Sequence, residues 1–336
     1  MMDLHTHWWV LATEEELKID HPLSRQLLSV PIVLFRDAVG QPAALIDRCP
    51  HRHAPLSGGQ VRRGEVACPY HGWRFDETGC CTDVPGLETS LGHQPLVRSI
   101  RTCVAHGMVW ACLSPADTTP PPVAPSISGN DLDAFMMTDT VHCTMPAAAE
   151  NFLDGFHTHF VHAGWIRRDQ KRQQVRAHVR ALPDGVEARY SEEGLQSGWI
   201  SRLLESDRAE SMGRFKLPGI AEIEYRGKKG LNVLITAWLT PETERQVRVH
   251  ARIATRQGFA PQWLKKGVLQ HLFGVILRQD KAILEQTERN IERFSQLPMT
   301  PPILLDTPLD LLGPAIRCLM NGEALPELNQ DILLKL

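Results

Sequence analysis

The sequence predicts an α+β protein of two successive domains, and three features of the chain lead to this prediction. Residues 32–113 consist of short apolar runs interrupted by glycine, proline and aspartate, which is typical of a small antiparallel β domain. Residues 114–125 are rich in proline and therefore unsuited to a helix or a central strand. The remainder mixes helical and strand patterns, and 336 residues exceed what one hydrophobic core usually supports. We expect a first domain at residues 1–115, a linker at 116–126 and a second domain at 127–336.

The composition excludes several classes of protein. Hydrophobic residues make up 43% of the chain, charged residues make up 22%, and the formal net charge is −3. A nucleic-acid-binding protein usually carries a strong basic excess, so nucleic acid is not an expected partner. Residues 1–9 contain no basic region followed by a long apolar run. We therefore expect neither a secretory signal nor a membrane anchor, and the cytoplasm is the expected compartment.

Eight cysteines in a chain without an expected secretory signal favour reduced thiols and metal ligation over a disulfide framework. Cys49 and Cys68 belong to the metal motif described next. A disulfide between the adjacent Cys80 and Cys81 would be strained and is the less favoured alternative. The other cysteines are expected to be ordinary, partly buried side chains: Cys80, Cys81, Cys103, Cys112, Cys143 and Cys318.

Two short motifs in the first domain, Cys49-Pro50-His51 and Cys68-Pro69-Tyr70-His71, each combine a cysteine with a histidine. Sixteen residues separate them, and each follows an expected strand. A [2Fe-2S] cluster with two cysteines on one iron and two histidines on the other requires this mixed ligand set. The alternative is a Cys2His2 zinc site, but zinc sites usually group the two cysteines together and the two histidines together.

The second domain begins with a helix-like stretch near Ala147. Residues 231–239 and 246–254 are expected to form a hairpin, because apolar and polar residues alternate in the second of these segments. A long amphipathic helix is expected from about 261 to 294, with Gly274 as the point where it could break.

A second cluster of ligand types lies at the start of this domain, where Asp154, His157, His159 and His162 fall within nine residues. A mononuclear non-haem iron site needs two histidines and one carboxylate on one face of the metal. On a regular helix Asp154 and His157 share a face, because three residues correspond to about 60° of rotation. His157 and His162 would be about 140° apart, so by this criterion His159 and His162 are the better pair.

A distant carboxylate in the long helix is a candidate third ligand. Asp280 lies within a stripe of apolar residues at helical spacing: Phe273, Ile276, Leu277, Ile283, Leu284 and Ile291. A buried carboxylate is costly unless a cation or metal is its partner. The alternative for Asp280 is therefore a buried ion pair with an arginine. Glu285 and Glu288 lie away from the centre of the stripe and are expected to be solvated.

The first motif pair resembles the signature of the Rieske non-haem iron oxygenases, which hydroxylate aromatic rings or demethylate oxidatively. The match includes Cys49-Pro50-His51-Arg52 and Cys68-Pro69-Tyr70-His71-Gly72-Trp73, with proline and Gly-Trp positions that are not ligands. The resemblance implies that Cys49 and Cys68 hold one iron of the cluster and that His51 and His71 hold the other. It covers both domains and implies a Rieske β domain followed by a catalytic domain of helix-grip type, an antiparallel sheet flanked by helices.

The second cluster resembles the family motif Asp-x-x-His-x-x-x-x-His, which maps onto Asp154, His157 and His162. Residues 279–285 also resemble the family segment that supplies the carboxylate ligand. The resemblance therefore implies that His157, His162 and Asp280 bind the mononuclear iron. A π-bulge or a break is then expected between the two histidines. His159 is left with a structural role or a contact to one of the ligands.

The resemblance gives Asp154 a catalytic role as a hydrogen-bonded bridge for electron transfer between His71 of one subunit and His157 of the next. The two metal sites of one chain are expected to lie too far apart, so the function requires a head-to-tail ring, for which a homotrimer is the simplest closure. The alternative for Asp154 is a carboxylate at a helix start, favoured by the helix dipole.

The resemblance also implies O2 as co-substrate and electrons from NAD(P)H through a separate reductase, with or without a ferredoxin. The short chain and the spacing of its histidines look like the single-component monooxygenases related to vanillate and dicamba O-demethylases. We therefore expect hydroxylation or oxidative demethylation of an aromatic or heterocyclic small molecule. Ring cis-dihydroxylation is the alternative within the family. A Rieske electron-transfer protein without oxygenase activity is the alternative of another class.

Overall fold

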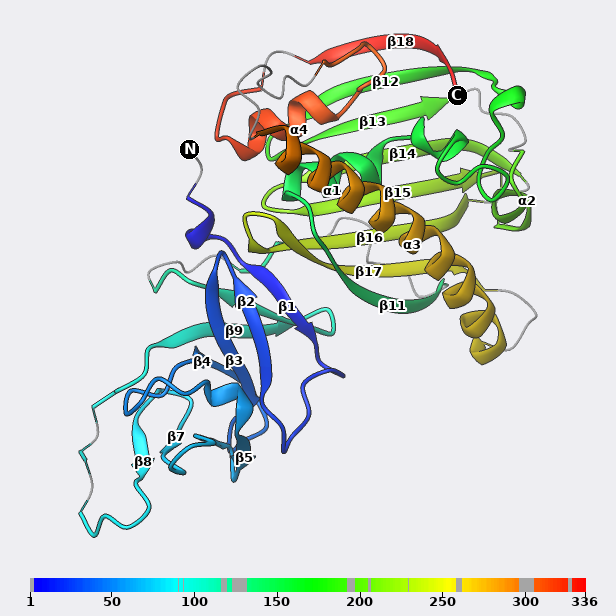
Figure 1. Cartoon of the computed structure of the whole chain (residues 1–336). Helices are drawn as coiled ribbons and strands as arrows, with labels where there is room; N and C mark the ends of the chain where they lie inside the picture. The colour runs from blue at the N-terminus through cyan, green and yellow to red at the C-terminus, as the bar shows by residue number, and fades with distance from the viewer. Residues whose placement is uncertain are drawn as a thin grey trace. The chain divides into compact units, whose positions relative to one another are not determined.

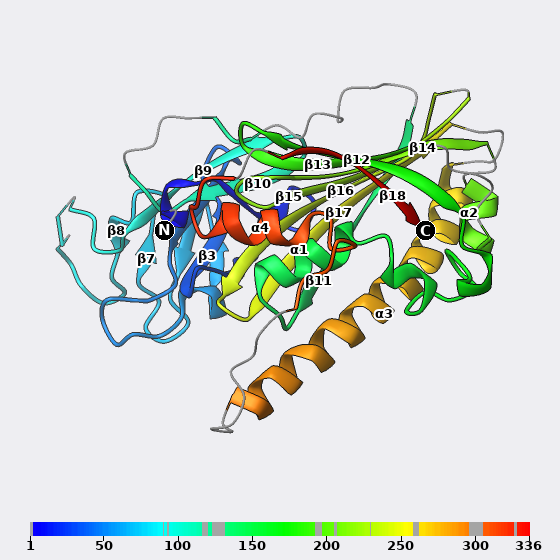
Figure 2. The same ribbon diagram turned by 90° about the horizontal axis from the view of Figure 1, so that it is seen from above.

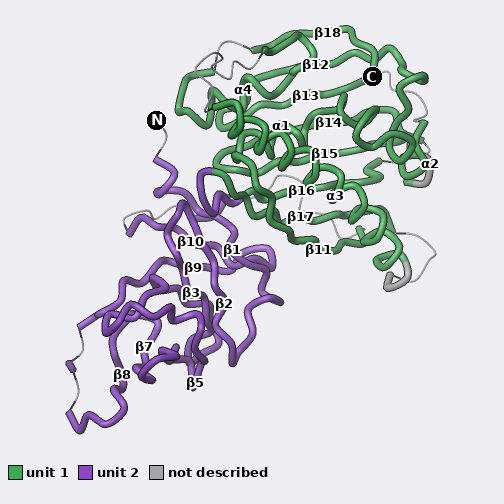
Figure 3. Tube along the Cα trace, in the orientation of Figure 1, with its two compact units in different colours: residues 1–2, 123–239, 245–336 green, residues 3–122, 240–244 purple. Residues whose placement is uncertain are grey.

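The computed structural model describes residues 3–89, 91–92, 94–115, 120–122, 132–191, 197–204, 207–228, 230–257, 262–295, 305–325 and 328–336. Figure 3 colours the two compact units into which the chain divides. The N-terminal unit comprises residues 3–122 and 240–244, and the C-terminal unit comprises residues 1–2, 123–239 and 245–336. The expected linker at 116–126 lies largely outside the described residues, so the domain boundaries stay a prediction.

The N-terminal unit consists of short antiparallel strands, as its interrupted apolar runs predicted (Figure 1). Six strands form one sheet in the order β1-β10-β9-β4-β3-β2, and four form another in the order β5-β6-β7-β8. The strands are β1 (Trp9–Thr13), β2 (Leu23–Leu27), β3 (Val30–Arg36), β4 (Pro42–Ile46), β5 (Gln60–Arg62), β6 (Glu65–Ala67), β7 (Arg74–Phe75), β8 (Cys81–Asp83), β9 (Ser99–Ala105) and β10 (Met108–Cys112). Two 3-10 turns, η1 (Leu4–Thr6) and η2 (Leu56–Gly58), complete the unit.

The C-terminal unit is built on one eight-stranded sheet in the order β11-β17-β16-β15-β14-β13-β12-β18. Its strands are β11 (Leu132–Val141), β12 (Gln174–Leu182), β13 (Gly185–Ser191), β14 (Arg208–Lys216), β15 (Ile220–Gly227), β16 (Gly230–Thr243), β17 (Gln246–Arg256) and β18 (Asn329–Lys335). The predicted hairpin is present, but its strands β16 and β17 are longer than expected and leave only Glu244 and Arg245 as the turn. An antiparallel sheet with few helices is the expected α+β fold.

The helices of this unit are α1 (Met145–Leu153), α2 (Trp199–Leu204), α3 (Gln262–Ser295) and α4 (Gly313–Met320). Figures 1 and 2 show α1, α3 and α4 on the same face of the sheet. The expected break near Gly274 is absent, because α3 runs without interruption for 34 residues. Among the described residues, no helix combines the length and the apolar character needed to cross a membrane.

Apolar packing and ion pairs together hold α3 on the sheet. Its buried face includes Leu272 and Ile276, which pack in one cluster with Phe135 of β11 and Ile253 of β17. Ion pairs also join α3 to β11 at two positions along the helix. Lys265 Nζ lies 2.9 Å from an Asp133 oxygen, and Lys281 Nζ lies 2.8 Å from an Asp139 oxygen. These contacts fix both the rotation of α3 and its position along the sheet.

Glu288 departs from the sequence-based expectation. It was expected to be solvated, but its side chain is 4% exposed and lies 2.8 Å from the guanidinium of Arg245. Arg245 belongs to the turn of the β16–β17 hairpin, so this ion pair ties the turn to α3. The helical spacing alone could not reveal it, because the cation comes from another element.

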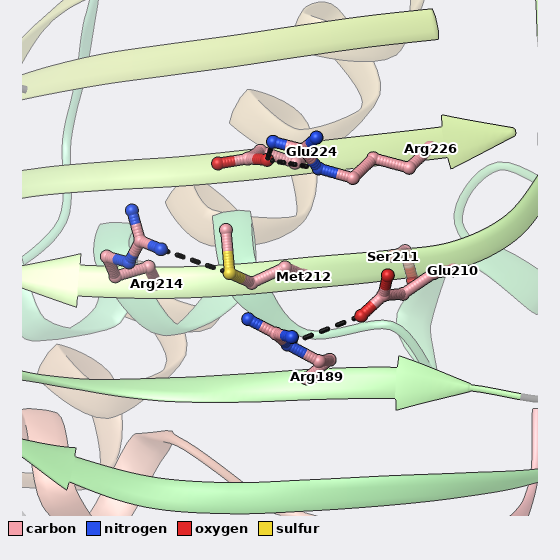
Figure 4. A pocket seen from close by; sticks show the side chains of 7 residues that line it. All are labelled: Arg189, Glu210, Ser211, Met212, Arg214, Glu224 and Arg226. Carbon is pink, nitrogen blue, oxygen red and sulfur yellow. Dashed lines mark hydrogen bonds and ion pairs between the residues drawn. The ribbon is translucent and has the colours of Figure 1, made fainter. Parts of the chain in front are cut away.

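The face of the sheet opposite the helices carries charged side chains in register. Glu187 of β13 lies opposite Arg214 of β14, which in turn lies opposite Glu222 of β15. Next to this row is a hollow of about 270 Å3, shown in Figure 4 with the seven side chains that line it, among them Arg214 and the ion pair of Arg189 with Glu210. Arg214 approaches Glu187 to 2.6 Å and Glu222 to 3.3 Å, so one guanidinium pairs with two buried carboxylates.

We expect Glu187→Gln to destabilise the protein by about 1–3 kcal/mol near neutral pH, because it removes the buried negative charge that pairs with the partly buried Arg214. Burial alone would raise the pKa of Glu187, but Arg214 and Arg180 outweigh burial and hold this pKa below its ordinary value. A depressed folded-state pKa gives stability that is present above the unfolded pKa of about 4.3 and is lost as pH falls through the folded value.

The difference in stability between the Glu187→Gln variant and the unmodified protein should therefore be largest at pH 7 and shrink below about pH 4. Thermal unfolding midpoints across this range measure it. Glu210→Gln is the matched control, since the pair of Glu210 with Arg189 is well exposed and contributes little. Equal midpoints for the Glu187 variant and the unmodified protein at pH 7 would show that the carboxylate is dispensable.

Candidate metal centres

The two Cys/His loops of the N-terminal unit share one backbone construction. Cys49 follows β4 and Cys68 follows β6. In each loop the carbonyl of the cysteine accepts a hydrogen bond from the N–H four residues later, His53 at 2.9 Å and Gly72 at 3.0 Å. Both of those residues have a positive φ, 62° and 75° respectively. Two matching tight turns therefore present one thiol and one imidazole each.

The four side chains of these loops lie together. The thiols of Cys49 and Cys68 are buried and interact, and burial raises the pKa of the Cys49 thiol to about 11. The imidazole rings of His51 and His71 have centroids 4.5 Å apart, and His71 lies at the surface. Trp73 stacks on His51 with an angle of 7° between the rings, which holds this imidazole in place. The side-chain Nδ1 of His51 is buried without a hydrogen-bond partner, as expected of a nitrogen reserved for a metal.

The zinc alternative fits this arrangement poorly. A tetrahedral zinc site would bring all four donor atoms within about 4 Å of one another. Among the described residues, the group of metal-binding side chains whose donor atoms lie within 4.8 Å of one another consists of His157, His162 and Asp280. The four side chains of the two Cys/His loops do not form such a group. A two-iron cluster spans a longer distance and fits two separate pairs. None of the eight cysteines, all of them described, forms a disulfide.

The second cluster lies in a loop that follows α1. The helix ends at Leu153, and the carboxylate of Asp154 accepts hydrogen bonds from the backbone N–H groups of Phe156 at 2.7 Å and His157 at 3.1 Å. A single 3-10 turn, η3 (His157–His159), comes next. The regular-helix geometry that favoured His159 with His162 is therefore wrong, and of the expected π-bulge or break the structure has the break. Asp154 lies at the C-terminal end of α1, so it is not a carboxylate at the start of this helix.

This loop and α3 bring the three expected iron ligands together. The Nε2 atoms of His157 and His162 are 3.2 Å apart, and they lie 3.4 Å and 3.0 Å from Oδ1 of Asp280. All three donor atoms fall within 4.8 Å of one another. His159 is 2% exposed and is not part of this group, and its Nδ1 lies 3.3 Å from the carbonyl oxygen of Phe156. The ion pairs of Asp280 are with the two histidines, and no arginine among the described residues pairs with it.

The electrostatics of this group favour a cation at its centre. Burial alone would lower the pKa of His157, but the carboxylates of Asp154 and Asp280 raise it to about 9. Burial would likewise raise the pKa of Asp280, yet His157 and His162 hold it below its ordinary value. The two carboxylates therefore draw a positive charge to the ring nitrogens. Two imidazoles and a carboxylate meeting at one point form the ligand set of a non-haem iron site, so the residues fit the metal.

Each imidazole of the group also has a partner on its other nitrogen. Nδ1 of His157 lies 3.5 Å from Asp154 Oδ2, and Nδ1 of His162 lies 2.9 Å from Oε1 of Gln279. Such partners orient metal-ligating histidines. The sequence indicated Asp154 but gave Gln279 no role. The available signal was its position immediately before Asp280.

Comparisons with known proteins give a match to a segment of each unit. Residues 7–103 match the Rieske [2Fe-2S] domain, and residues 141–321 match the vanillate O-demethylase oxygenase C-terminal domain. The chain is 28% identical to the 4beta-methylsterol monooxygenase of Methylococcus capsulatus over 87% of this chain and 82% of that protein. It is 34% identical to the oxygenase component of dicamba O-demethylase from Stenotrophomonas maltophilia over about half of each chain, 48% of both. The crystal structure of dicamba monooxygenase bound to dicamba has the same fold, with a TM-score of 0.81 and 23% identity over 96% of this chain and 98% of that one.

Proposed function

The chain belongs to the family of Rieske oxygenases with a vanillate O-demethylase type C-terminal domain, and we propose that it is a terminal oxygenase that monooxygenates a small organic molecule. It is an oxidoreductase that uses a Rieske [2Fe-2S] cluster and a mononuclear iron. The observation that carries the proposal is the convergence of His157, His162 and Asp280 in a chain that also has the paired Cys/His loops. An electron-transfer protein would need only the loops.

In this proposal Cys49, Cys68, His51 and His71 hold the cluster, and His157, His162 and Asp280 hold the iron. When bound, the cluster supplies single electrons and the iron activates O2. The chain's own residues prepare the site for this cation. Asp154 and Asp280 together contribute two negative charges that balance a divalent ion, and His157 must release its proton when the metal binds.

The proposed reaction is hydroxylation of a carbon, with oxidative demethylation as the favoured form. One O2, two electrons and two protons convert R–O–CH3 into R–O–CH2OH and water, and this hemiacetal then releases formaldehyde and R–OH. The electrons come from NAD(P)H through a separate reductase, with or without a ferredoxin. Two relatives named above, a monooxygenase and an O-demethylase, support this class of reaction. Ring cis-dihydroxylation remains the alternative within the family.

We also propose a head-to-tail homotrimer in the cytoplasm, in which Asp154 links the metal sites of neighbouring subunits. Asp154 lines a cleft of about 730 Å3 beside α1, α3 and α4, and its side chain is 35% exposed. Leu305 and Leu309 line the same cleft and are 87% and 44% exposed. We propose that this Asp154 cleft binds the loop that contains His71 in a second copy of the chain. That loop exposes both the His71 imidazole and Tyr70.

The test is O2 consumption by anaerobically reconstituted protein supplied with NADH and a surrogate reductase. We expect a visible spectrum that bleaches with dithionite, and O2 uptake that a methoxy- or N-methyl-bearing aromatic compound stimulates, with formaldehyde formed in proportion. A bleachable spectrum without substrate-stimulated O2 uptake across such a panel would favour an electron-transfer protein. A colourless protein containing zinc would contradict the proposal entirely.

A further inference from the structure

We propose that Gln279 is a positioning residue for the mononuclear iron site, which fixes the tautomer and the orientation of His162. The inference rests on the proposed iron site and deepens it. Its basis is the 2.9 Å contact between Oε1 of Gln279 and Nδ1 of His162, whose side chain is 1% exposed. At this burial solvent cannot serve as the partner of Nδ1, so the amide oxygen is the group that holds a proton on this nitrogen.

The amide oxygen selects the form of His162 that can bind a metal. A neutral imidazole carries one proton, and the nitrogen opposite that proton is the one that can ligate. An oxygen facing Nδ1 accepts a hydrogen bond, so a proton stays on Nδ1, and Nε2, which lies beside Asp280 and His157, is the nitrogen whose lone pair becomes available when a metal replaces its proton. With the amide reversed, its NH2 group would face Nδ1 and the proton would occupy the metal-facing nitrogen. Only the observed orientation is compatible with ligation.

The position of Gln279 in the fold makes this contact rigid. It precedes Asp280 on α3, so a single helical segment supplies one ligand and holds another. The ion pair of Lys281 with Asp139 fastens the next residue of the same segment to β11. His162 comes from a loop that lies 117 residues earlier in the chain. Gln279 therefore couples the loop that bears both histidines to the helix that bears the carboxylate.

The choice of an amide also limits the charge of the site. His157 already has the carboxylate of Asp154 behind it. A second carboxylate behind His162 would add a negative charge next to Asp280. The neutral amide fixes the tautomer without adding that charge, and two carboxylates then match one divalent cation.

The experiment measures binding of Co2+, a spectroscopic probe, by protein that keeps its Rieske cluster but has been stripped of mononuclear metal with a chelator. We expect Gln279→Leu to weaken Co2+ binding by about 10- to 100-fold and to change the ligand-field bands of bound Co2+, because His162 loses its fixed tautomer. Gln279→Glu restores an acceptor at the same distance and should bind Co2+ within a few-fold of the native protein. If Gln279 had only a structural role, the Gln279→Leu and Gln279→Glu variants would not differ in this way in Co2+ affinity.

Gln286→Leu is the matched control, because Gln286 is an exposed glutamine on the same helix and should bind Co2+ like the native protein. Equal Co2+ affinity and spectra for Gln279→Leu and the native protein would overturn the inference, and so would a loss in Gln279→Glu as large as in Gln279→Leu. If the native protein itself bound no Co2+, the proposed iron site would be wrong. These outcomes separate the failure of the inference from the failure of the proposed function.

Discussion

Asp280→Ala is expected to abolish both mononuclear iron binding and substrate turnover while leaving the visible spectrum of the Rieske cluster unchanged. Asp280 supplies the anionic donor of the three that converge, and its Oδ1 lies within 3.4 Å of both histidine Nε2 atoms. Losing a residue that only orients a ligand costs about 10- to 100-fold in metal affinity, so losing the ligand itself should cost more. The cluster ligands lie in the other unit, in loops that do not depend on α3.

Iron content after gel filtration, the visible spectrum and substrate-stimulated O2 uptake measure this prediction together. Glu285→Ala is the matched control, because Glu285 is a carboxylate on the same helix whose ion pair with Arg289 is 3.9 Å long and partly exposed. The control should keep iron and turnover. Full turnover by Asp280→Ala would assign the carboxylate ligand to another residue.

The proposed metal ligands differ in how local their signal is in the sequence. Cys49 and His51, like Cys68 and His71, are neighbours in tight turns, so the motif itself contains most of their geometry. Asp280 could also be predicted, because a carboxylate within an apolar helical stripe must have a partner in the folded protein. In both cases a short stretch of residues carries the physical constraint.

The histidine pair predicted from helix geometry was wrong because residues 154–162 do not form an α-helix. The argument that His157 and His162 should splay apart assumed a regular helix through residues 154–162, but α1 ends at Leu153. Asp154 itself explains the change, since its carboxylate binds the N–H groups of the next turn and competes with helical hydrogen bonds. The sequence predicted a hydrogen-bonded bridge at Asp154, or a carboxylate at a helix start, and neither interpretation included a cap on the turn that follows.

Partners that come from distant elements could not be predicted. Glu288 was expected in solvent, yet Arg245 from a hairpin turn 43 residues earlier pairs with it. Gln279 and His162 are 117 residues apart and meet only because the sheet holds α3 beside the loop. Neither of these two contacts can be predicted from a sequence pattern, because both arise from tertiary packing.

Asp154→Asn is expected to slow reoxidation of the reduced cluster in a single turnover while both metals stay bound. Asparagine keeps one oxygen that can accept the N–H group of Phe156, so the turn retains one of its two caps, while an NH2 group replaces the oxygen that accepts from the N–H of His157. It removes the negative charge beside Nδ1 of His157, 3.5 Å away, and with it the acceptor that holds the Nδ1 proton. The expected slowing lies between about 10-fold, the cost of losing a partner behind a metal-ligating histidine, and about 10⁴-fold, the cost of Asp→Asn behind a catalytic histidine.

Stopped-flow measurement of the cluster spectrum after mixing reduced protein with O2 and substrate determines this rate. Asp310→Asn is the matched control, because Asp310 lines the same cleft and its carboxylate also caps a turn, at Thr307, without contacting His157. A general effect of charge on subunit docking would slow both variants, whereas a bridge through the imidazole would slow Asp154→Asn alone. Unchanged reoxidation in Asp154→Asn would mean that electrons reach the mononuclear site by a route that does not use this carboxylate. The remaining reason for a carboxylate at this position would then be the backbone turn that it caps.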